Sequence, residues 1–196
     1  MSPRIGILLF DGAEELDFVG PWEVFTMAAR SVPGLEVATF AQADRPVACA
    51  KGMRVLADRL LDPLPELDVV LVPGGQGTRR EVENPVAIEW LRKVSARCAW
   101  VTSVCTGALL LCEAGLARRV TTHWAFVEEL RRRHPEVEVR ERVRYVCDGN
   151  VVTAAGVSAG IDMALWLCGR LWGVDVARNT QRAMEYDPAP PYAADA

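Results

Sequence analysis

Short apolar segments alternate along the chain with longer segments of helical periodicity, and this alternation constrains the fold more than any other feature. Four segments have the composition of buried strands: "RIGILLF" (4–10), "EVATFA" (36–41), "DVVLVPGG" (68–75) and "AWVTSV" (99–104). Continuous apolar runs of this length are typical of strands that are covered on both faces. Helical segments are interspersed at 20–30, 84–98 and 106–117. The alternation predicts βαβ units, and therefore an α/β fold with a mostly parallel sheet.

Turn residues set the expected boundaries of several elements. Pro21 is expected at the first helical position of 20–30, where its missing N–H costs no hydrogen bond. Asp148-Gly149-Asn150 predicts a β-hairpin within 136–156. Further helices are expected at 122–134, 158–173 and 175–185. The 196 residues suggest one domain (1–196) with a substantial core, and the Pro/Ala-rich end (187–196) is expected to be an extended tail.

Composition disfavours several classes of function. The formal net charge is −4 and there is no basic block, so a nucleic-acid partner is not expected. No apolar stretch is long enough for a membrane span, and no secretion signal is apparent at the N-terminus. The six cysteines form no C-x-x-C pair, which favours free thiols in a reducing, cytoplasmic compartment. With only two histidines and no ligand-like spacing, a metal site is not expected.

Cys105 stands where a predicted strand turns into a predicted helix, in "VTSVCTGALLL" (101–111). Such a turn lifts a side chain above the sheet, as in the nucleophile elbow of hydrolases. A thiolate at a helix N-terminus is stabilised by the helix dipole, so its pKa is expected to fall. The alternative is a buried structural cysteine, which is the interpretation for the other five. Position alone leaves both interpretations of Cys105 open.

Other candidates follow strands that end at the same edge of the sheet, where ligands of such folds bind. The N–H groups of Gly74 and Gly75, with that of Thr106, could stabilise negative charge on an intermediate, although a tight turn is the alternative. Asp17 lies between apolar residues, so its pKa is expected to be raised and it could deliver a proton. His123 could act beside Cys105 or be a hydrogen-bonded structural histidine.

Five segments, in order along the chain, resemble the ThiJ/PfpI superfamily, which has a class I glutamine amidotransferase-like fold. They are "ELDFVGPWEVF" (15–25), "VPGG" (72–75), "VTSVCTGALLL" (101–111), "LARRVTTHW" (116–124) and "AAGVSAGIDMAL" (154–165). The resemblance implies a flavodoxin-like three-layer sandwich with a nucleophilic Cys105, and a homodimer as the default assembly. It favours the functional interpretation of Cys105 over the structural one.

Within the superfamily, the segments are most similar to those of the isonitrile hydratases. The similarity places Asp17 at the position of the catalytic acid and "VCTG" (104–107) at that of the nucleophile, with Thr106 tuning the site. It implies hydration of a small-molecule isonitrile to an N-formamide through a thioimidate on Cys105, without a cofactor. The chain stops soon after "QRAMEYDPAPPY" (181–192), where the hydratase continues into a helical tail. Contacts between subunits that such a tail makes are therefore in doubt.

Other activities within the superfamily are weighed against the hydratase. The peptidases carry a histidine directly after the nucleophile, where this chain has Thr106, so peptidase activity is disfavoured. The glyoxalase- or deglycase-like members typically use glutamate where Asp17 stands, which makes that alternative less favoured without excluding it. Another cysteine hydrolase of the superfamily is a further alternative. The AraC-type regulators share "VCTGA" and "TTHW" but continue into a DNA-binding domain of about a hundred residues, for which this chain has no room. A ligand or redox sensor that binds without turnover is the last alternative.

Overall fold

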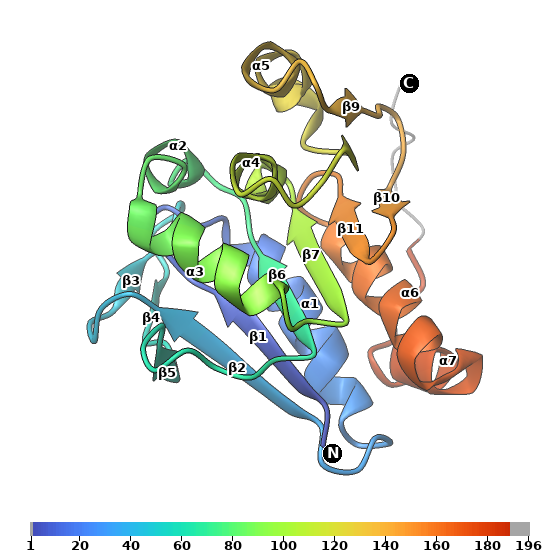
Figure 1. Ribbon diagram of the computed structural model, residues 1–196. Coiled ribbons are helices and arrows are strands. Elements are labelled where there is room, and N and C mark those ends of the chain that lie inside the picture. Colours follow the sequence, from blue (N-terminus) through green and yellow to red (C-terminus); the bar gives the residue numbers. More distant parts are fainter. Residues whose placement is uncertain (1, 189–196) are drawn as a thin grey trace.

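A seven-stranded sheet forms the centre of the computed structural model, which describes residues 2–188, in the order β10-β11-β7-β6-β1-β2-β5 (Figure 1). All neighbouring strands are parallel except β10 and β11, which form the expected antiparallel hairpin. The strands are β1 (Arg4–Leu8), β2 (Glu36–Ala41), β5 (Arg59–Leu60), β6 (Val69–Val72), β7 (Trp100–Val104), β10 (Tyr145–Asp148) and β11 (Val151–Ala154). The prediction of a mostly parallel sheet is confirmed.

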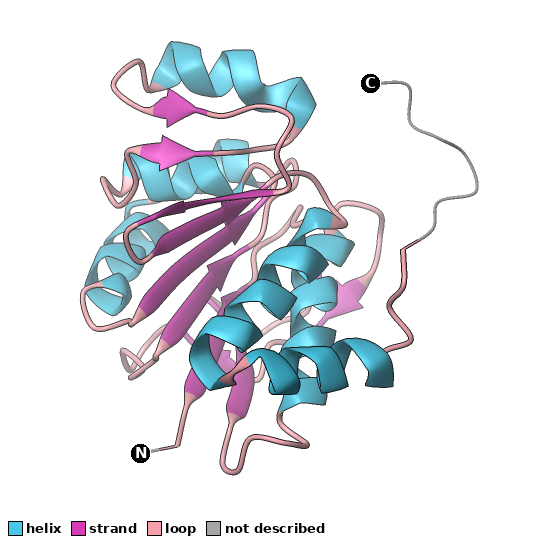
Figure 2. Cartoon of the chain, turned by 90° about the vertical axis from the view of Figure 1, so that its right-hand side faces the viewer, coloured by secondary structure: helices cyan, strands magenta, loops and turns pink. Residues whose placement is uncertain are grey.

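Helices cover both faces of the sheet and give three layers (Figure 2). On one face α1 (Glu15–Ala28), α6 (Ala159–Trp172) and α7 (Val174–Ala183) pack together. The other face carries α3 (Pro85–Ser95) and α4 (Gly107–Glu113), with the short α2 (Thr78–Glu81) beside α4. This is the flavodoxin-like α/β sandwich that was predicted.

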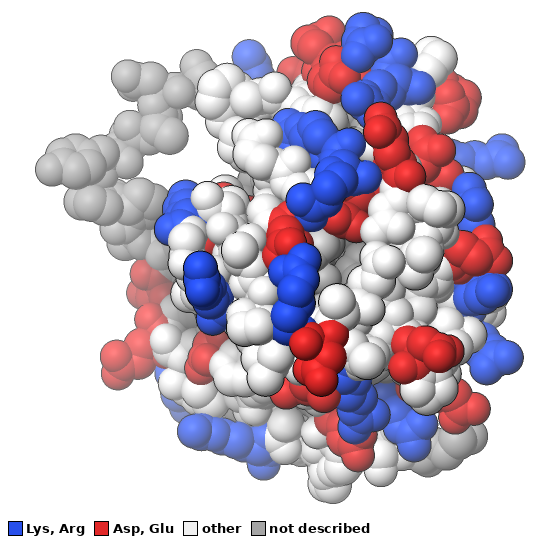
Figure 3. All heavy atoms as spheres, turned by 90° about the vertical axis from the view of Figure 1, so that its left-hand side faces the viewer, with Lys and Arg blue, Asp and Glu red and all other residues white. Residues whose placement is uncertain are grey.

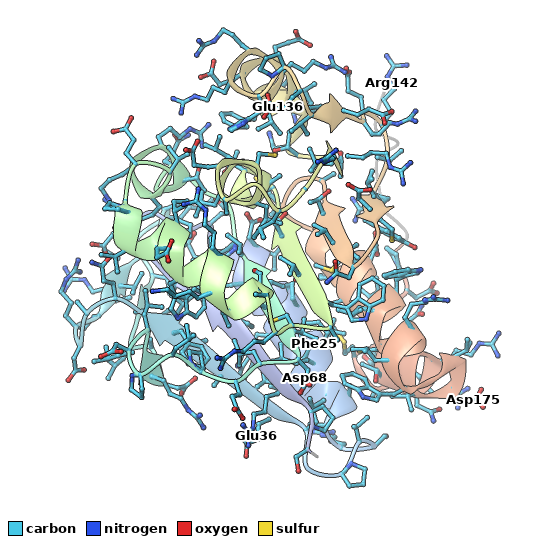
Figure 4. All side chains as sticks on the ribbon, in the orientation of Figure 1. Phe25, Glu36, Asp68, Glu136, Arg142 and Asp175 are labelled. Carbon is cyan, nitrogen blue, oxygen red and sulfur yellow. The ribbon has the colours of Figure 1, made fainter. Side chains whose placement is uncertain are left out.

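Burial on both faces explains why the central strands are continuous apolar runs. Every residue of β6 is buried, and so is every residue of β1 after Arg4. Figure 4 shows Phe25 of α1 in the interior, where it is completely buried, whereas Arg142 and Asp175 lie at the periphery. The buried hydrophobic residues form one contiguous core cluster, which extends from β1 to α6.

Two helix predictions are wrong in detail. Helix α1 begins at Glu15 and contains Pro21 in its interior, so Pro21 is not at the first helical position. The acidic residues Glu15 and Asp17 occupy the first turn instead, where the helix dipole favours negative charge. The helix expected at 122–134 is divided into η1 (Trp124–Phe126) and α5 (Val127–Arg133), because the His123 side chain caps a short 3₁₀ turn.

Several short strands lie outside the expected set. Two small two-stranded sheets pair β3 (Val47–Ala48) with β4 (Arg54–Val55), and β8 (Arg119–Val120) with β9 (Glu138–Val139). Two-residue strands have no periodicity that a sequence pattern can reveal. The tail expected at 187–196 falls outside the described residues from 189 onward.

Two observations on the described residues concern membranes and metals. Within residues 2–188, no helix combines the length and the apolar character that a membrane crossing needs. Nor does this part of the chain bring three or more His, Cys, Asp or Glu side chains together in a group that could hold a metal ion. On the face seen in Figure 3, acidic and basic side chains are interspersed and no patch of one sign dominates.

Candidate active site

Cys105 forms a strained turn between β7 and α4. Its φ angle is 57°, a left-handed conformation that a residue other than glycine adopts at a cost of about 1–3 kcal/mol. Three hydrogen bonds hold it there: its N–H donates to the carbonyls of Ala154 (3.1 Å) and Ala155 (2.7 Å), and its carbonyl accepts from the Thr122 hydroxyl (2.9 Å). The turn therefore presents the thiol at the carboxyl edge of the sheet, as a nucleophile elbow does.

Asp17 lies in the first turn of α1 and is completely buried. The N–H of Gly74 donates to its Oδ2 at 2.9 Å, whereas its Oδ1 is buried without a hydrogen-bond partner among the described residues. Burial raises the pKa of Asp17 to about 7, against the opposing effects of the Gly74 N–H and of the neighbouring Cys105 thiol. The raised pKa agrees with the expectation, so near neutral pH this carboxyl exchanges a proton readily.

The pKa of the Cys105 thiol moves in the direction opposite to the expectation. Burial, and after it the negative charge of Asp17, raises this pKa to about 12. The backbone N–H groups of Thr106 and Val157 lower this pKa, but their effect is smaller than that of burial and of the Asp17 charge. A thiol that is only 6% exposed and lies beside a carboxylate loses more solvation energy than these N–H groups return.

The backbone N–H groups of Gly74 and Gly75 are occupied by side chains of the protein. Gly74 donates to Asp17, and Gly75 donates to the Thr106 hydroxyl at 2.9 Å. Both glycines thus position site residues here and do not point at a ligand, which differs from the expected oxyanion-binding arrangement. A Cβ on Gly74 would lie 2.5 Å from the Thr106 nitrogen and 2.8 Å from both Asp17 Oδ2 and Cys105 Cβ, so only glycine fits.

Thr106 and Thr78 connect the Gly75 turn to the cysteine turn. The Thr106 hydroxyl interacts with the Gly75 carbonyl at 3.1 Å and with the Thr78 hydroxyl at 3.1 Å. Its hydrogen bonds in this structure do not include Asp17. Thr106 is therefore placed to fix the shape of the site.

His123 lines the same pocket as Cys105 without a hydrogen bond to it. Its Nδ1 accepts the N–H of Ala125 at 3.2 Å, so the neutral ring carries its proton on Nε2. Burial, and then the positive charge of Arg79, lowers the pKa of His123. A neutral histidine that offers Nε2–H can donate to a ligand but is not arranged to deprotonate the thiol.

The pocket at Cys105 has a volume of about 220 Å³. Besides Gly75, Cys105, Thr106 and His123, its lining includes Glu14, Gln76, Arg79, Ala125, Phe126 and Val157. Sequence reasoning missed Arg79 and Val157. The positive φ of Val157 (46°) is a feature of the folded backbone that no sequence motif predicts. The aromatic residues considered from the sequence lie elsewhere: Phe18 is in the core, while Trp22 and Trp124 are exposed.

A larger pocket, of about 460 Å³, lies near the carboxyl ends of β1 and β2. Its charged lining residues form ion pairs with one another: Asp11 pairs with Arg45, and Arg80 pairs with Glu81. Cys105, Thr106 and His123 line the smaller pocket and not this one, and Asp17 lines neither of the two.

Comparison with known proteins identifies the family of this chain. The chain matches the DJ-1/PfpI family over residues 3–169. It is 39% identical over 194 residues to the isonitrile hydratase of Pseudomonas putida, covering 98% of this chain and 82% of that one. A ThiJ/PfpI family protein from Pseudomonas syringae has a similar structure, with a TM-score of 0.91, 30% identity, and coverage of 100% of this chain and 80% of the other.

A transcriptional regulator is also among the relatives. The chain is 32% identical over 180 residues to the HTH-type transcriptional regulator CdhR of Pseudomonas aeruginosa. The match covers 90% of this chain but 53% of the regulator, so the chain spans about half of that protein's length.

Proposed function

The chain belongs to the DJ-1/PfpI family, and from this premise we propose that it is an isonitrile hydratase that uses Cys105 as nucleophile and Asp17 as acid and base. The observation that carries the proposal is that Asp17 and Cys105 are buried together, with the pKa of the Asp17 carboxyl raised to about 7. The identity of 39% to an isonitrile hydratase supports the same reaction. The aspartate at this position favours the hydratase over the glyoxalase-like alternative.

The first step joins the cysteine to the substrate. The Cys105 thiolate attacks the terminal carbon of the isonitrile, and protonated Asp17 delivers its proton to that carbon. A C–S bond and a C–H bond form, and the product is a thioimidate with Asp17 ionised. The N–H groups of Thr106 and Val157, which lower the pKa of the thiol, stabilise the thiolate before the attack.

The second stage releases the formamide. Asp17 takes a proton from water while the hydroxyl adds to the thioimidate carbon, and the same proton passes to the nitrogen. Asp17 then removes the hydroxyl proton as the C–S bond breaks. The products are the N-formamide, the Cys105 thiolate and protonated Asp17, so each group returns to its starting state. Written this way, the reaction requires no metal or organic cofactor.

Three further expectations belong to the same proposal. The chain acts as one domain over 1–196, and the contiguous core from β1 to α6 supports this. The six free cysteines fit a reducing, cytoplasmic compartment. The active assembly is a homodimer, and light scattering should therefore give twice the 21.5 kDa mass of one chain. A monomer that retains full activity would contradict this assembly.

The decisive experiment incubates the protein with a small isonitrile and follows formamide by mass spectrometry. Cys105→Ala should abolish formamide production, because no thioimidate can form. Cys112→Ala is the matched control, since Cys112 is buried in α4, the helix that follows Cys105, and does not line the pocket. A parallel assay with methylglyoxal tests the glyoxalase alternative. Binding of an isonitrile without turnover of either compound would favour the sensor, an alternative that the similarity to a regulator keeps open.

A further inference from the structure

Arg79 is a charged residue in the pocket of Cys105 that takes no part in the reaction as written. It lies in α2, four residues after Gly75. Its Nη1 donates to the Gly75 carbonyl at 3.1 Å and to the Thr78 hydroxyl at 3.2 Å. Its guanidinium carbon lies 4.4 Å from the centre of the Phe126 ring. These contacts hold the guanidinium in one place on the pocket wall.

This guanidinium makes no ion pair with any described residue, whereas its neighbour Arg80 pairs with Glu81. Within the described part of the chain, Nε and Nη2 of Arg79 also make no hydrogen bond. Glu14, the carboxylate that lines the pocket, is paired with Lys51. The pocket therefore holds a fixed positive charge with unused donors.

The surroundings make this charge available to a ligand. Burial lowers the pKa of Arg79, but a guanidinium remains protonated at neutral pH. The ionisable groups that act on it are Cys105 in the same pocket and Arg133 and Glu129 on α5, and Glu129 is already engaged by Arg132 and Arg133. A partly desolvated positive charge without a carboxylate partner gains more from an incoming anion than an exposed one does.

We propose that Arg79 binds a carboxylate on the substrate, so that the protein prefers isonitriles carrying a carboxylate close to the isonitrile group. This inference rests on the proposed hydratase function. The planar donors of arginine match the two oxygens of a carboxylate. A pocket of about 220 Å³ takes a compact molecule, with the isonitrile carbon at Cys105 and the carboxylate at Arg79. The simplest such substrate is isocyanoacetate.

The test compares kcat/KM for isocyanoacetate with kcat/KM for its ethyl ester, which differs in charge at the same position. The wild type should favour the acid. In Arg79→Gln the acid-to-ester ratio should fall by about 10–100-fold, as expected for loss of a charge-assisted hydrogen bond. Arg79→Lys should retain part of the preference. Arg80→Gln, a control next to it in the chain, should leave the ratio unchanged. An unchanged ratio in Arg79→Gln would overturn the inference.

A binding measurement separates this inference from the hydratase proposal. Calorimetry on Cys105→Ala, with and without Arg79→Gln, measures the affinity for N-formylglycine, the acid that hydration of isocyanoacetate yields. Binding that depends on Arg79, without turnover by the wild type, would reject the hydratase and keep the anion site. Turnover of both isonitriles without dependence on Arg79 would reject the anion site and keep the hydratase. Absence of both binding and turnover would reject both.

Discussion

The carboxyl of Asp17 and the thiol of Cys105 act as one titrating unit, because each is buried and each affects the pKa of the other. Loss of the first proton, near pH 7, leaves one negative charge on the pair. That charge can reside on the carboxylate or on the thiolate, and the two forms contain the same number of protons. The reactive form is the one with the thiolate and the protonated acid.

The pH dependence of turnover follows from this shared proton. With a neutral isonitrile, kcat/KM should rise as the pH passes through about 7 and then remain level, since the singly ionised pair is the reactive species. A pH–rate profile of the wild type measures this dependence of kcat/KM on pH. Activity that instead declines through pH 7 would show that the fully protonated pair reacts.

Substitutions in the site should rank in a fixed order. Asp17→Asn should lower turnover by about 10²–10⁴-fold, the usual effect of losing a general acid. His123→Ala should have a smaller effect, because its Nδ1 accepts a backbone N–H and its ring moves no proton in the mechanism. Formamide production by each purified variant gives the ranking. If His123→Ala were as inactive as Cys105→Ala while Asp17→Asn retained activity, a Cys–His hydrolase would replace the hydratase.

Among the elements, the turn that ends β6 is the one on which the site depends most. It carries Gly74, which contacts Asp17, and Gly75, which contacts Thr106. It thereby connects α1 to the cysteine turn at the start of α4. A small displacement of this turn would move the acid and the nucleophile at once.

Gly74→Ala tests the dependence on this turn. The added methyl group would lie 2.5 Å from the Thr106 nitrogen, so activity should fall by at least about tenfold as the pair is displaced. Gly169→Ala in α6 is the control, since a Cβ there meets nothing closer than 3.6 Å. Gly169→Ala should leave activity unchanged and raise the free energy of unfolding by about 0.5–1 kcal/mol, because alanine is favoured over glycine in a helix. Turnover assays and urea unfolding measure both effects, and full activity of Gly74→Ala would contradict the argument.

At the scale of the whole molecule, the buried acid couples catalysis to stability. The pKa of Asp17 rises on folding from about 3.8 to about 7, so the folded state binds more protons than the unfolded state between these values. Its contribution to stability is complete below about pH 4 and is lost as the pH rises through about 7. The raised pKa corresponds to roughly 4 kcal/mol over the whole window.

Thermal unfolding at several pH values checks this coupling. From pH 5 to pH 8, the Tm of Asp17→Asn should increase relative to that of the wild type, because the variant has no carboxyl to ionise. Asp11→Asn is the matched control: Arg45 and the Ala48 N–H hold the pKa of Asp11 below its usual value, so it stays ionised throughout. The difference in Tm between Asp11→Asn and the wild type should be constant from pH 5 to pH 8. A constant difference for Asp17→Asn would mean that its pKa is not raised.

The sequence by itself determined the longer strands, the mostly parallel sheet and the position of the cysteine turn. These follow from local patterns. Continuous apolar runs indicate strands that are covered on both faces, and a cysteine between a strand and a helix indicates the turn. Asp17 could also be selected from its apolar neighbours, and its raised pKa agrees with that selection.

Only the tertiary structure decided how the site residues are used. The N–H of Gly74 reaches an aspartate 57 positions away, and that of Gly75 reaches a hydroxyl 31 positions away, so no local pattern shows that both donors are occupied. The direction of the pKa shift of Cys105 depends on the balance between burial, the Asp17 charge and the N–H of Val157. Arg79 joins the pocket because α2 and η1 meet beside it. Solvation and Coulomb energies sum over all neighbours in space, and those neighbours exist only once the chain has folded.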